Sequence, residues 1–290
     1  MPSLYFLGIR KSVIKKTPPF KYLFDARDKR NYRRMAALLS KNTRDLSAKE
    51  AIVNYSLNGK DLSLLFRKFP CSDLSVLHQV FMLGCYEPII KQMASHYPAH
   101  ANLKIIDAGA NVGYSAIYFK TFFPSSELIA IEPEKNNVEQ LQKNLSLNNL
   151  SLTRFVQGAL WYRKAFLEVV RDFRDNREAA FTVKETDNAG GIPGFSFDEV
   201  LQNENWRHVD LLKIDIEGGE RFLFDSSQKA DAILQKTTFL AIEIHDEFHI
   251  RNTIYDHLKR NGFDYFEFDD LTLAINKNKI ERIHASEMTA

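Results

Sequence analysis

The feature that most constrains the fold is an apolar run that ends in an acid and two glycines. It reads Leu103-Lys-Ile-Ile-Asp-Ala-Gly-Ala-Asn-Val-Gly113, and helix-forming sequence follows it. This order predicts a buried strand, a tight turn and the start of a helix. In an open α/β sheet, ligands bind beyond the carboxyl end of such a strand. The run therefore predicts a small-ligand site.

The acid at this turn narrows the choice of ligand. A dinucleotide site has the spacing Gly-x-Gly-x-x-Gly, so that backbone N–H groups face a pyrophosphate. Here the glycines are Gly109 and Gly113, and Asp107 stands where a pyrophosphate would approach. A nicotinamide-dependent oxidoreductase is therefore disfavoured, and a ligand with a cationic amine and a sulfonium is favoured.

A second acid ends the next apolar run, Leu128-Ile-Ala-Ile-Glu132, which Pro133 follows. An acid at that position can accept hydrogen bonds from both hydroxyls of a ribose. An amine at one strand end and a ribose at the next describe S-adenosylmethionine, whereas the alternative is a glycine-rich turn with ordinary strand-end acids. The cofactor contacts that we predict at these two ends are Asp107, Gly109, Asn111, Gly113, Glu132 and Pro133.

A third strand end offers a place for the adenine ring. Gly158 and Ala159 are small enough to let a ring lie against the backbone, and Leu160 or Trp161 can cover its face.

Short apolar runs separated by connections of mostly helical length predict an α/β fold with a parallel sheet covered on both faces. The runs are 103–108, 128–132, 154–159, 209–216 and 239–244. Near the end of the chain, 264–268 and 271–275 are expected to close the sheet with an antiparallel hairpin. This arrangement predicts a Rossmann-like class I methyltransferase fold. A helix is expected from Pro133 to Asn149, with Pro133 in its first turn.

The first part of the chain reads as helical. Apolar residues at helical spacing between Asn31 and about Phe69 predict a mainly helical extension over 1–76, and residues 77–290 form the expected methyltransferase domain. The stretch from Leu77 to Met93 is expected to be a helix interrupted near Gly84 and Pro88. The alternation of predicted strands and helices is interrupted at residues 160–200, which we interpret as an insertion on the substrate side.

This insertion contains a predicted hairpin, Phe166–Val170 with Ala180–Val183. Arg171, Arg174 and Arg177 surround its loop. They suit a phosphate or carboxylate of the substrate, and equally a solvated turn.

Charge is unevenly distributed along the chain. Residues 1–44 contain twelve Lys or Arg against two Asp, whereas the whole chain has a net charge of only +2. Apolar residues among these charges, from Leu4 to Ile14, suit a peripheral contact with an anionic membrane or an acidic substrate, and equally packing on the domain. The sequence lacks the clustered aromatic and basic residues of a nucleic-acid-binding module, so we do not expect a nucleic-acid substrate.

Cysteine usage and hydropathy predict a cytoplasmic protein. Cys71 and Cys85 form no Cys-x-x-Cys motif and are too few for a zinc site or a disulfide framework. We therefore expect both to be reduced thiols in the core. The sequence has no apolar run of membrane-spanning length, and Leu4–Ile9 is too short for an export signal. We therefore expect the protein in the cytoplasm, with its basic arm able to reach the inner membrane surface. The oligomeric state stays open.

Acids and one imidazole gather after the fourth and fifth strands. Asp215 and Glu217 follow one strand, and Glu243 and His245 follow the other. Methyl transfer to a hydroxyl needs an aligned acceptor and a general base. The unperturbed pKa of a histidine lies near cellular pH, so His245 is our candidate for that base. The alternatives are a structural His245, or a divalent cation held by Asp215, Glu217, His245 and Asp246.

Several of these segments together resemble the FkbM-type family of S-adenosylmethionine-dependent methyltransferases. The resemblance rests on Tyr86-Glu-Pro88, Ile106–Tyr114, Ile131–Glu134, Asn144–Asn149, Phe195–Val200, Asp210–Glu220 and Ala241–His245. Its most specific piece is Lys213-Ile-Asp-Ile-Glu-Gly-Gly-Glu220. Ser196-Phe-Asp198 stands where the family usually has Thr-Leu-Asp.

The resemblance implies O-methylation of a hydroxyl on a sugar, glycan or related natural product. By position, it implies that Asp107, Gly109, Asn111 and Glu132 hold the cofactor. Asp215 and Glu217 would line the site near the methyl group, with Asp215 also touching the cofactor, and Glu87 would meet the methionine amine. A protein that kept the fold and lost the chemistry is the competing interpretation.

Overall fold

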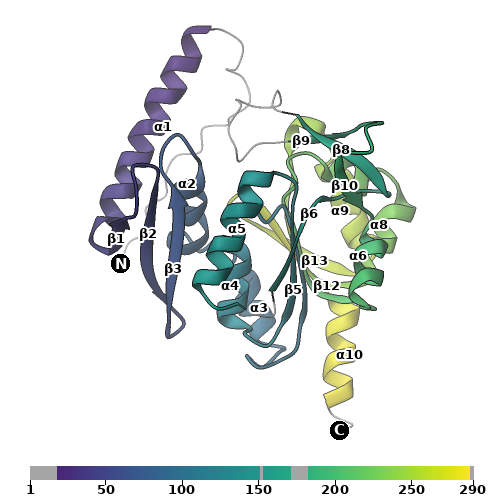
Figure 1. The fold of residues 1–290 in the computed structure, drawn as a ribbon. Helices are drawn as coiled ribbons and strands as arrows, with labels where there is room; N and C mark the ends of the chain where they lie inside the picture. The colour runs from purple at the N-terminus through teal and green to yellow at the C-terminus, as the bar shows by residue number, and fades with distance from the viewer. Residues whose placement is uncertain (1–17, 151–152, 171–181, 288–290) are drawn as a thin grey trace.

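The computed structural model describes residues 18–150, 153–170 and 182–287. Its centre is a seven-stranded sheet between two layers of helices (Figure 1), with the strand order β13-β14-β12-β11-β4-β5-β6. The strands are β4 (Lys104–Ala108), β5 (Glu127–Glu132), β6 (Thr153–Gln157), β11 (Val209–Ile214), β12 (Thr237–Glu243), β13 (Phe263–Phe268) and β14 (Leu271–Asn276). β14 pairs antiparallel with both β12 and β13, and the other neighbours are parallel. This order confirms the predicted class I methyltransferase fold.

Alternating side chains divide the core between the two faces of the sheet. Ile105 belongs to one hydrophobic cluster and Ile106 to the other, as the two-residue period of a strand requires. One face is covered by α3 (Glu87–Ala94), α4 (Tyr114–Phe122) and α5 (Lys135–Leu147), and the other by α6 (Phe197–Glu204), α8 (Ser227–Leu234) and α9 (Arg251–Arg260) (Figure 1). Both faces are therefore buried, which explains why the central strands are apolar throughout.

The N-terminal part corrects one prediction. Helix α1 (Pro18–Leu39) and a single 3-10 turn, Ser40–Asn42, are followed by an antiparallel sheet of β1 (Thr43–Asp45), β2 (Glu50–Leu57) and β3 (Lys60–Arg67). The helical prediction for 31–69 is wrong beyond this turn. Asn58 and Gly59 have φ of 52° and 71°, the conformation of a two-residue hairpin turn. An Asn-Gly pair between apolar runs was the sequence signal for this hairpin.

Side-chain amides of α5 and of Asn148, which caps the C-terminus of that helix, pair with the backbone of β3 as a neighbouring strand would. Asn148 accepts from the Ser63 N–H (3.0 Å) and donates to the Ser63 carbonyl (2.9 Å). Asn144 does the same with Leu65, at 2.8 and 3.1 Å. Four residues of helix rise about 6.0 Å and two residues of strand about 6.6 Å, so the spacings match. The N-terminal sheet is thereby joined to the methyltransferase fold, and it shares a core with α5.

Two further helix predictions can be compared with the structure. The predicted interruption is confirmed near Gly84: α2 (Asp73–Leu77) continues as a π-helical turn (His78–Met82), and α3 begins at Glu87, with Pro88 inside its first turn. By contrast, α5 begins at Lys135, because the Glu134 side chain caps it by accepting from the Asn137 N–H. The placement of Pro133 in the first helical turn is therefore wrong, since it precedes the cap.

The insertion forms a second small sheet, in the order β7-β10-β8-β9. Its strands are β7 (Ala159–Leu160), β8 (Ala165–Val170), β9 (Thr182–Glu185) and β10 (Ile192–Phe195). The antiparallel pairing of β8 with β9 confirms the predicted hairpin. Arg171, Arg174 and Arg177 lie outside the described residues, as do Leu4 to Ile14 of the basic arm.

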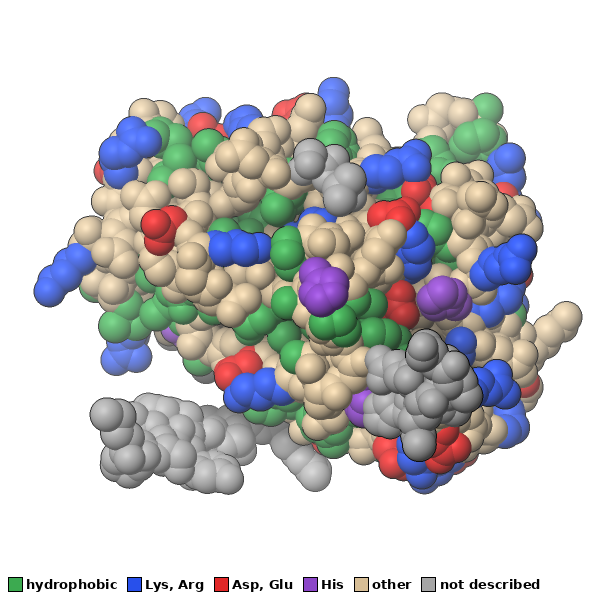
Figure 2. All heavy atoms as spheres, turned by 90° about the horizontal axis from the view of Figure 1, so that it is seen from below, with side chains coloured by type: hydrophobic (Ala, Val, Ile, Leu, Met, Phe, Trp, Pro, Cys, Tyr) green, Lys and Arg blue, Asp and Glu red, His purple; other side chains and the backbone are tan. Residues whose placement is uncertain are grey.

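The remaining elements are α7 (Glu220–Leu223), a 3-10 turn (Asp246–Phe248) and α10 (Lys277–Glu287), which projects at the end of the sheet opposite the insertion (Figure 1). Seen from that end, basic and acidic side chains are intermixed on the described surface (Figure 2). None of the helices in the described part of the chain is long and apolar enough to cross a membrane.

Candidate functional site

The turn after β4 brings backbone close to the end of β11. Gly109 (φ 77°) and Asn111 (φ 50°) both adopt left-handed conformations. A Cβ at Gly109 would lie 1.7 Å from the carbonyl oxygen of Asp215, so only glycine fits there. This close approach joins the predicted cofactor turn to the acidic segment that follows β11.

Glu132, at the end of β5, holds this turn from the other side. Its carboxylate is buried and accepts from the N–H of Asn111 (2.9 Å), the N–H of Glu134 (3.0 Å) and the amide of Asn137 (3.2 Å). Burial raises the pKa of Glu132 to about 7, although these three donors act in the opposite direction. The carboxylate has lone pairs left for further donors, which suits the predicted contact with ribose hydroxyls.

A cavity opens beside these groups, lined by residues of several neighbouring strand ends. The predicted residues that line it are Gly109, Asn111, Glu132, Pro133, Ala159, Leu160, Asp215 and Glu217. Trp161 lines it too, and its ring packs 4.8 Å from that of Phe222. The cavity therefore runs from the ribose-side acid to the acidic edge after β11.

Asp107 has a different place from the one predicted. It lies fully buried beneath the turn, where it accepts from the Ser115 hydroxyl (2.5 Å) and pairs with the Lys213 ammonium (3.3 Å). Lys213 also donates to the Gly109 carbonyl (2.6 Å) and lies 3.5 Å from Asp215. Asp107 is not among the described residues that line the cavity, so it supports the turn from below.

Three other predicted cofactor residues also stand back from the cavity lining. Gly158 lets β10 approach, since a Cβ there would lie 2.5 Å from the Phe195 ring. Gly113 (φ 87°) turns the chain into α4. Glu87 is an exposed residue of α3 and pairs with Lys91 at 2.6 Å. The space beside the Gly158 Cα is therefore filled by the Phe195 ring.

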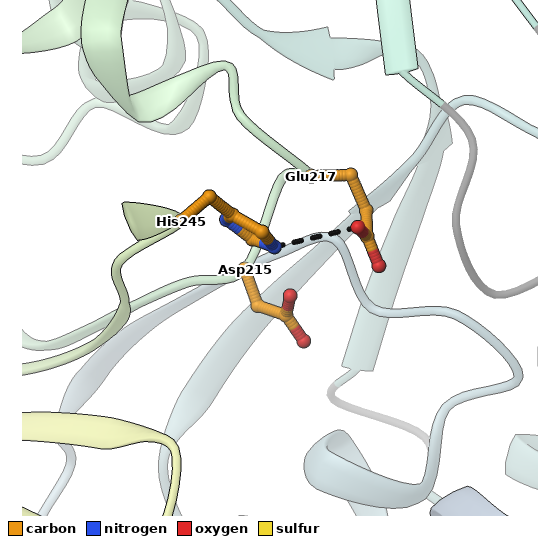
Figure 3. Close-up of side chains that lie close together, drawn as sticks. All are labelled: Asp215, Glu217 and His245. Carbon is orange, nitrogen blue, oxygen red and sulfur yellow. Dashed lines mark ion pairs between the residues drawn. The ribbon is translucent and has the colours of Figure 1, made fainter. Parts of the chain in front are cut away.

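The acids of the fourth and fifth strand ends converge as predicted. Asp215 and Glu217 follow β11, His245 follows the neighbouring β12, and one ligand atom from each lies within 4.8 Å of the others (Figure 3). The His245 Nε2 atom is 3.3 Å from Glu217 and 3.8 Å from Glu243. Burial, reinforced by Asp215, raises the pKa of Glu243 to about 8.

His245 is almost completely buried, and its other nitrogen, Nδ1, lies 3.0 Å from Glu220. Burial alone would lower its pKa, but the carboxylates of Glu217 and Glu220 outweigh that effect and raise the pKa to about 11. The imidazole therefore keeps a proton at neutral pH in this arrangement. The predicted role of general base would require His245 to lose that proton first.

Asp246 lies apart from this group. Its two carboxylate oxygens accept from the Arg251 guanidinium at 2.6 and 3.0 Å. The cluster contains Asp215, Glu217 and His245 but not Asp246. The sequence order places Asp246 beside His245, but the 3-10 turn that begins there directs it to α9.

Two functional features were missed by the sequence reasoning. Glu220 was quoted as part of a motif but given no role. The other is a chain of side chains from the N-terminal sheet: Arg67 pairs with buried Asp73 (2.7 Å) and donates to Asn137 (2.7 Å), which donates in turn to Glu132. No local pattern marks the link from Arg67 to the site, because Asn137 lies 70 residues along the sequence.

Comparisons with known proteins agree on the class of this domain. The profile of the family described as "Methyltransferase FkbM domain" matches residues 107–265. "Methyltransferase 1" of Beauveria bassiana is 26% identical over 136 residues, which cover 40% of this chain and 55% of that protein. "Methyltransferase sdnD" of Sordaria araneosa is 23% identical over 220 residues, covering 65% of this chain and 81% of that protein. This chain thus spans about half the length of the first relative.

Among solved structures, the methyltransferase FkbM of Methylobacillus flagellatus is similar, with 18% identity and a TM-score of 0.41. The match covers 60% of this chain and 43% of that one.

Proposed function

Because this chain belongs to the methyltransferase family defined by the FkbM domain, we propose that it transfers a methyl group from S-adenosylmethionine to a hydroxyl of a sugar, glycan or related natural product. One observation carries this proposal: a single cavity extends from Glu132 to Asp215 and Glu217. It can hold a ribose at one end and place a sulfonium near carboxylates at the other.

The residues present fit such a cofactor. The buried Asn111 Oδ1 atom has no hydrogen-bond partner among the described residues, and it belongs to a side chain that lines the cavity. A buried acceptor without a partner is costly, so a ligand donor there would stabilise it. Glu132 accepts the ribose hydroxyls in this proposal, and Leu160 and Trp161 cover the adenine. Bound S-adenosylmethionine supplies the electrophilic methyl group.

The acceptor side suits a polyhydroxylated molecule. Asp215, Glu217 and Glu243 present carboxylate oxygens, and these accept strong hydrogen bonds from hydroxyl groups. Methyl transfer from a sulfonium depends mainly on the alignment of the acceptor oxygen and on removal of its proton. We assign the positioning of the hydroxyl to Asp215 and Glu217.

His245 contributes to this edge in a modified role. Since it is protonated between Glu217 and Glu220, it is a weak candidate for the base at neutral pH. In the metal-free site the imidazolium fixes the Glu217 carboxylate in place and offsets part of the negative charge.

The test is binding followed by turnover. Calorimetry should detect S-adenosylhomocysteine binding by the full chain and no binding of NAD. The protein is then incubated with S-adenosylmethionine and a panel of free sugars, nucleotide sugars and glycans, and both S-adenosylhomocysteine release and a mass gain of one methylene on the acceptor are measured. Failure to bind S-adenosylhomocysteine would contradict the proposal.

A further inference from the structure

We propose that Asp215, Glu217 and His245 form a binding site for one divalent cation, with Nε2 of His245 and one carboxylate oxygen from each acid as its ligands. The proposal deepens the proposed function, on which its catalytic meaning rests, but the site itself is argued from the geometry alone.

The local backbone directs the two acids to one place. β11 ends at Ile214, and the following turn contains Glu217 (φ 52°) and Gly218 (φ 93°). A Cβ at Gly218 would lie 2.2 Å from the Phe248 ring, so the turn needs glycine at that position. A non-glycine residue with positive φ is costly and is often found at functional sites. Here Glu217 takes this conformation beside Asp215 and His245.

The distances suit a single ion. Ligand atoms at about 2.1 Å from an octahedral ion are separated by about 3.0 Å when adjacent and about 4.2 Å when opposite. One atom each from Asp215, Glu217 and His245 lies within 4.8 Å of the other two, and the His245 Nε2 to Glu217 distance is 3.3 Å. Small side-chain movements would therefore complete the coordination.

The orientation of His245 is the independent observation. Its Nδ1 atom lies 3.0 Å from Glu220 Oε1, which also accepts from the Ile216 N–H at 3.2 Å. Nε2 is buried and lies within ion-pair distance of Glu217, yet it makes no hydrogen bond within the described chain. Metal-binding histidines commonly donate one nitrogen to a carboxylate and present the other to the ion. Glu220 is the orienting carboxylate here, and a bound cation takes the place of the proton on Nε2, which is released to solvent.

Charge favours a cation at this position. The carboxylates of Glu217, Glu220 and Glu243 all lie within 4.0 Å of the His245 ring nitrogens. The ammonium of Lys213 lies near the carboxylates of both Asp107 and Asp215, so this one positive charge is shared between two acids. Carboxylate and imidazole ligands together suit Mn²⁺, Mg²⁺ or Zn²⁺. Because Asp215 and Glu217 also line the cavity, a cation held there would face the acceptor, where it would lower the pKa of a coordinated hydroxyl.

The experiment is a Mn²⁺ titration of the full chain, freed of metal with a chelator, followed by electron paramagnetic resonance of the unbound ion. We expect one bound Mn²⁺ per chain, displaced by excess Mg²⁺ or Zn²⁺. Glu217→Gln and His245→Asn each remove a ligand, and Glu220→Gln removes the orienting group, so each should weaken Mn²⁺ binding about tenfold or more. Asp246→Asn is the matched control and should change the affinity less than about twofold.

Two results would overturn the site: absence of a stoichiometric Mn²⁺ site, or equal weakening by Asp246→Asn and Glu217→Gln. Glu217→Gln preserves size at a partly exposed position, and its thermal unfolding in chelator is compared with that of the unmodified chain. S-adenosylhomocysteine binding is measured on the same samples. If the chain binds S-adenosylhomocysteine but no Mn²⁺, the metal site alone is rejected. If it binds Mn²⁺ but no S-adenosylhomocysteine, the proposed function is rejected.

Discussion

The two halves of the candidate site hold their acids in different ways. On the cofactor side, Glu132 is fixed by three neutral donors and Asp107 by Lys213 and Ser115. On the acceptor side, Glu217, Glu220 and Glu243 surround one imidazole. The first half is preorganised for a neutral, hydroxyl-bearing ligand, and the second carries excess negative charge. This difference suggests that the acceptor side is completed by a bound partner.

The largest expected effect is a loss of folding stability on substitution of Asp107, on the cofactor side of the site. Asp107→Ala leaves the buried Lys213 ammonium without its nearest carboxylate, and removing one partner of a buried ion pair costs about 3–5 kcal/mol. Urea unfolding should show this loss as a lower midpoint. The control is Asp198→Ala, which removes a partly exposed pair with Lys236 and should cost less than about 1 kcal/mol. Equal midpoints for the two variants would contradict a structural role for the Asp107–Lys213 pair.

The acceptor half should affect turnover and not cofactor affinity. With an acceptor identified by the screen, His245→Asn should lower kcat about a hundredfold, because Glu217 loses its partner and the positioning of the hydroxyl is disturbed. S-adenosylhomocysteine affinity should stay within about twofold, since His245 lies outside the lining of the cavity. If affinity falls together with kcat, the two halves are not separate.

The residue that should affect cofactor affinity most is Glu132. Glu132→Ala removes the acceptor for the ribose hydroxyls and releases the N–H groups of Asn111 and Glu134. We expect a loss of about 1–3 kcal/mol in S-adenosylhomocysteine binding, measured by calorimetry. Glu134→Gln, two residues along the chain at the cap of α5, is the control. Unchanged affinity of the Glu132 variant would place the nucleoside elsewhere.

The pH dependence of binding gives a finer test of the same group. Because burial raises the pKa of Glu132 to about 7 in the empty site, its carboxyl is protonated below that pH and ionised above it. Only the ionised form can accept from both hydroxyls, so affinity should fall about tenfold from pH 8 to pH 6. In Glu132→Gln this dependence should vanish. A variant that keeps the slope would assign it to the ligand.

The sequence predicted the central sheet and the reversed last strand because the apolar runs are short, buried on both faces and regularly spaced. It also predicted the lining by Gly109, Glu132 and Asp215, since a parallel sheet brings its strand ends to one edge. It did not predict that Asp107 is buried or that His245 is doubly paired. Both depend on Lys213 and Glu220, whose side-chain directions are set by tertiary packing. The β2–β3 hairpin was missed because helical spacing was given more weight than Asn58-Gly59.

The smallest predicted effect concerns the N-terminal sheet, which lies outside the family match and yet reaches the cofactor half. Arg67 connects β3 to Glu132 through Asn137. Arg67→Lys keeps a positive charge beside Asp73 but loses the forked contact that also reaches Asn137. Loss of one positioning hydrogen bond is worth about 0.5–1.5 kcal/mol, so S-adenosylhomocysteine affinity should fall about two- to tenfold. The control is the next residue, Lys68, which pairs with exposed Asp45. Lys68→Ala should leave S-adenosylhomocysteine affinity unchanged. If both variants bind alike, the sheet supports the fold without tuning the site; if only Arg67→Lys weakens binding, residues before the methyltransferase domain take part in holding its cofactor.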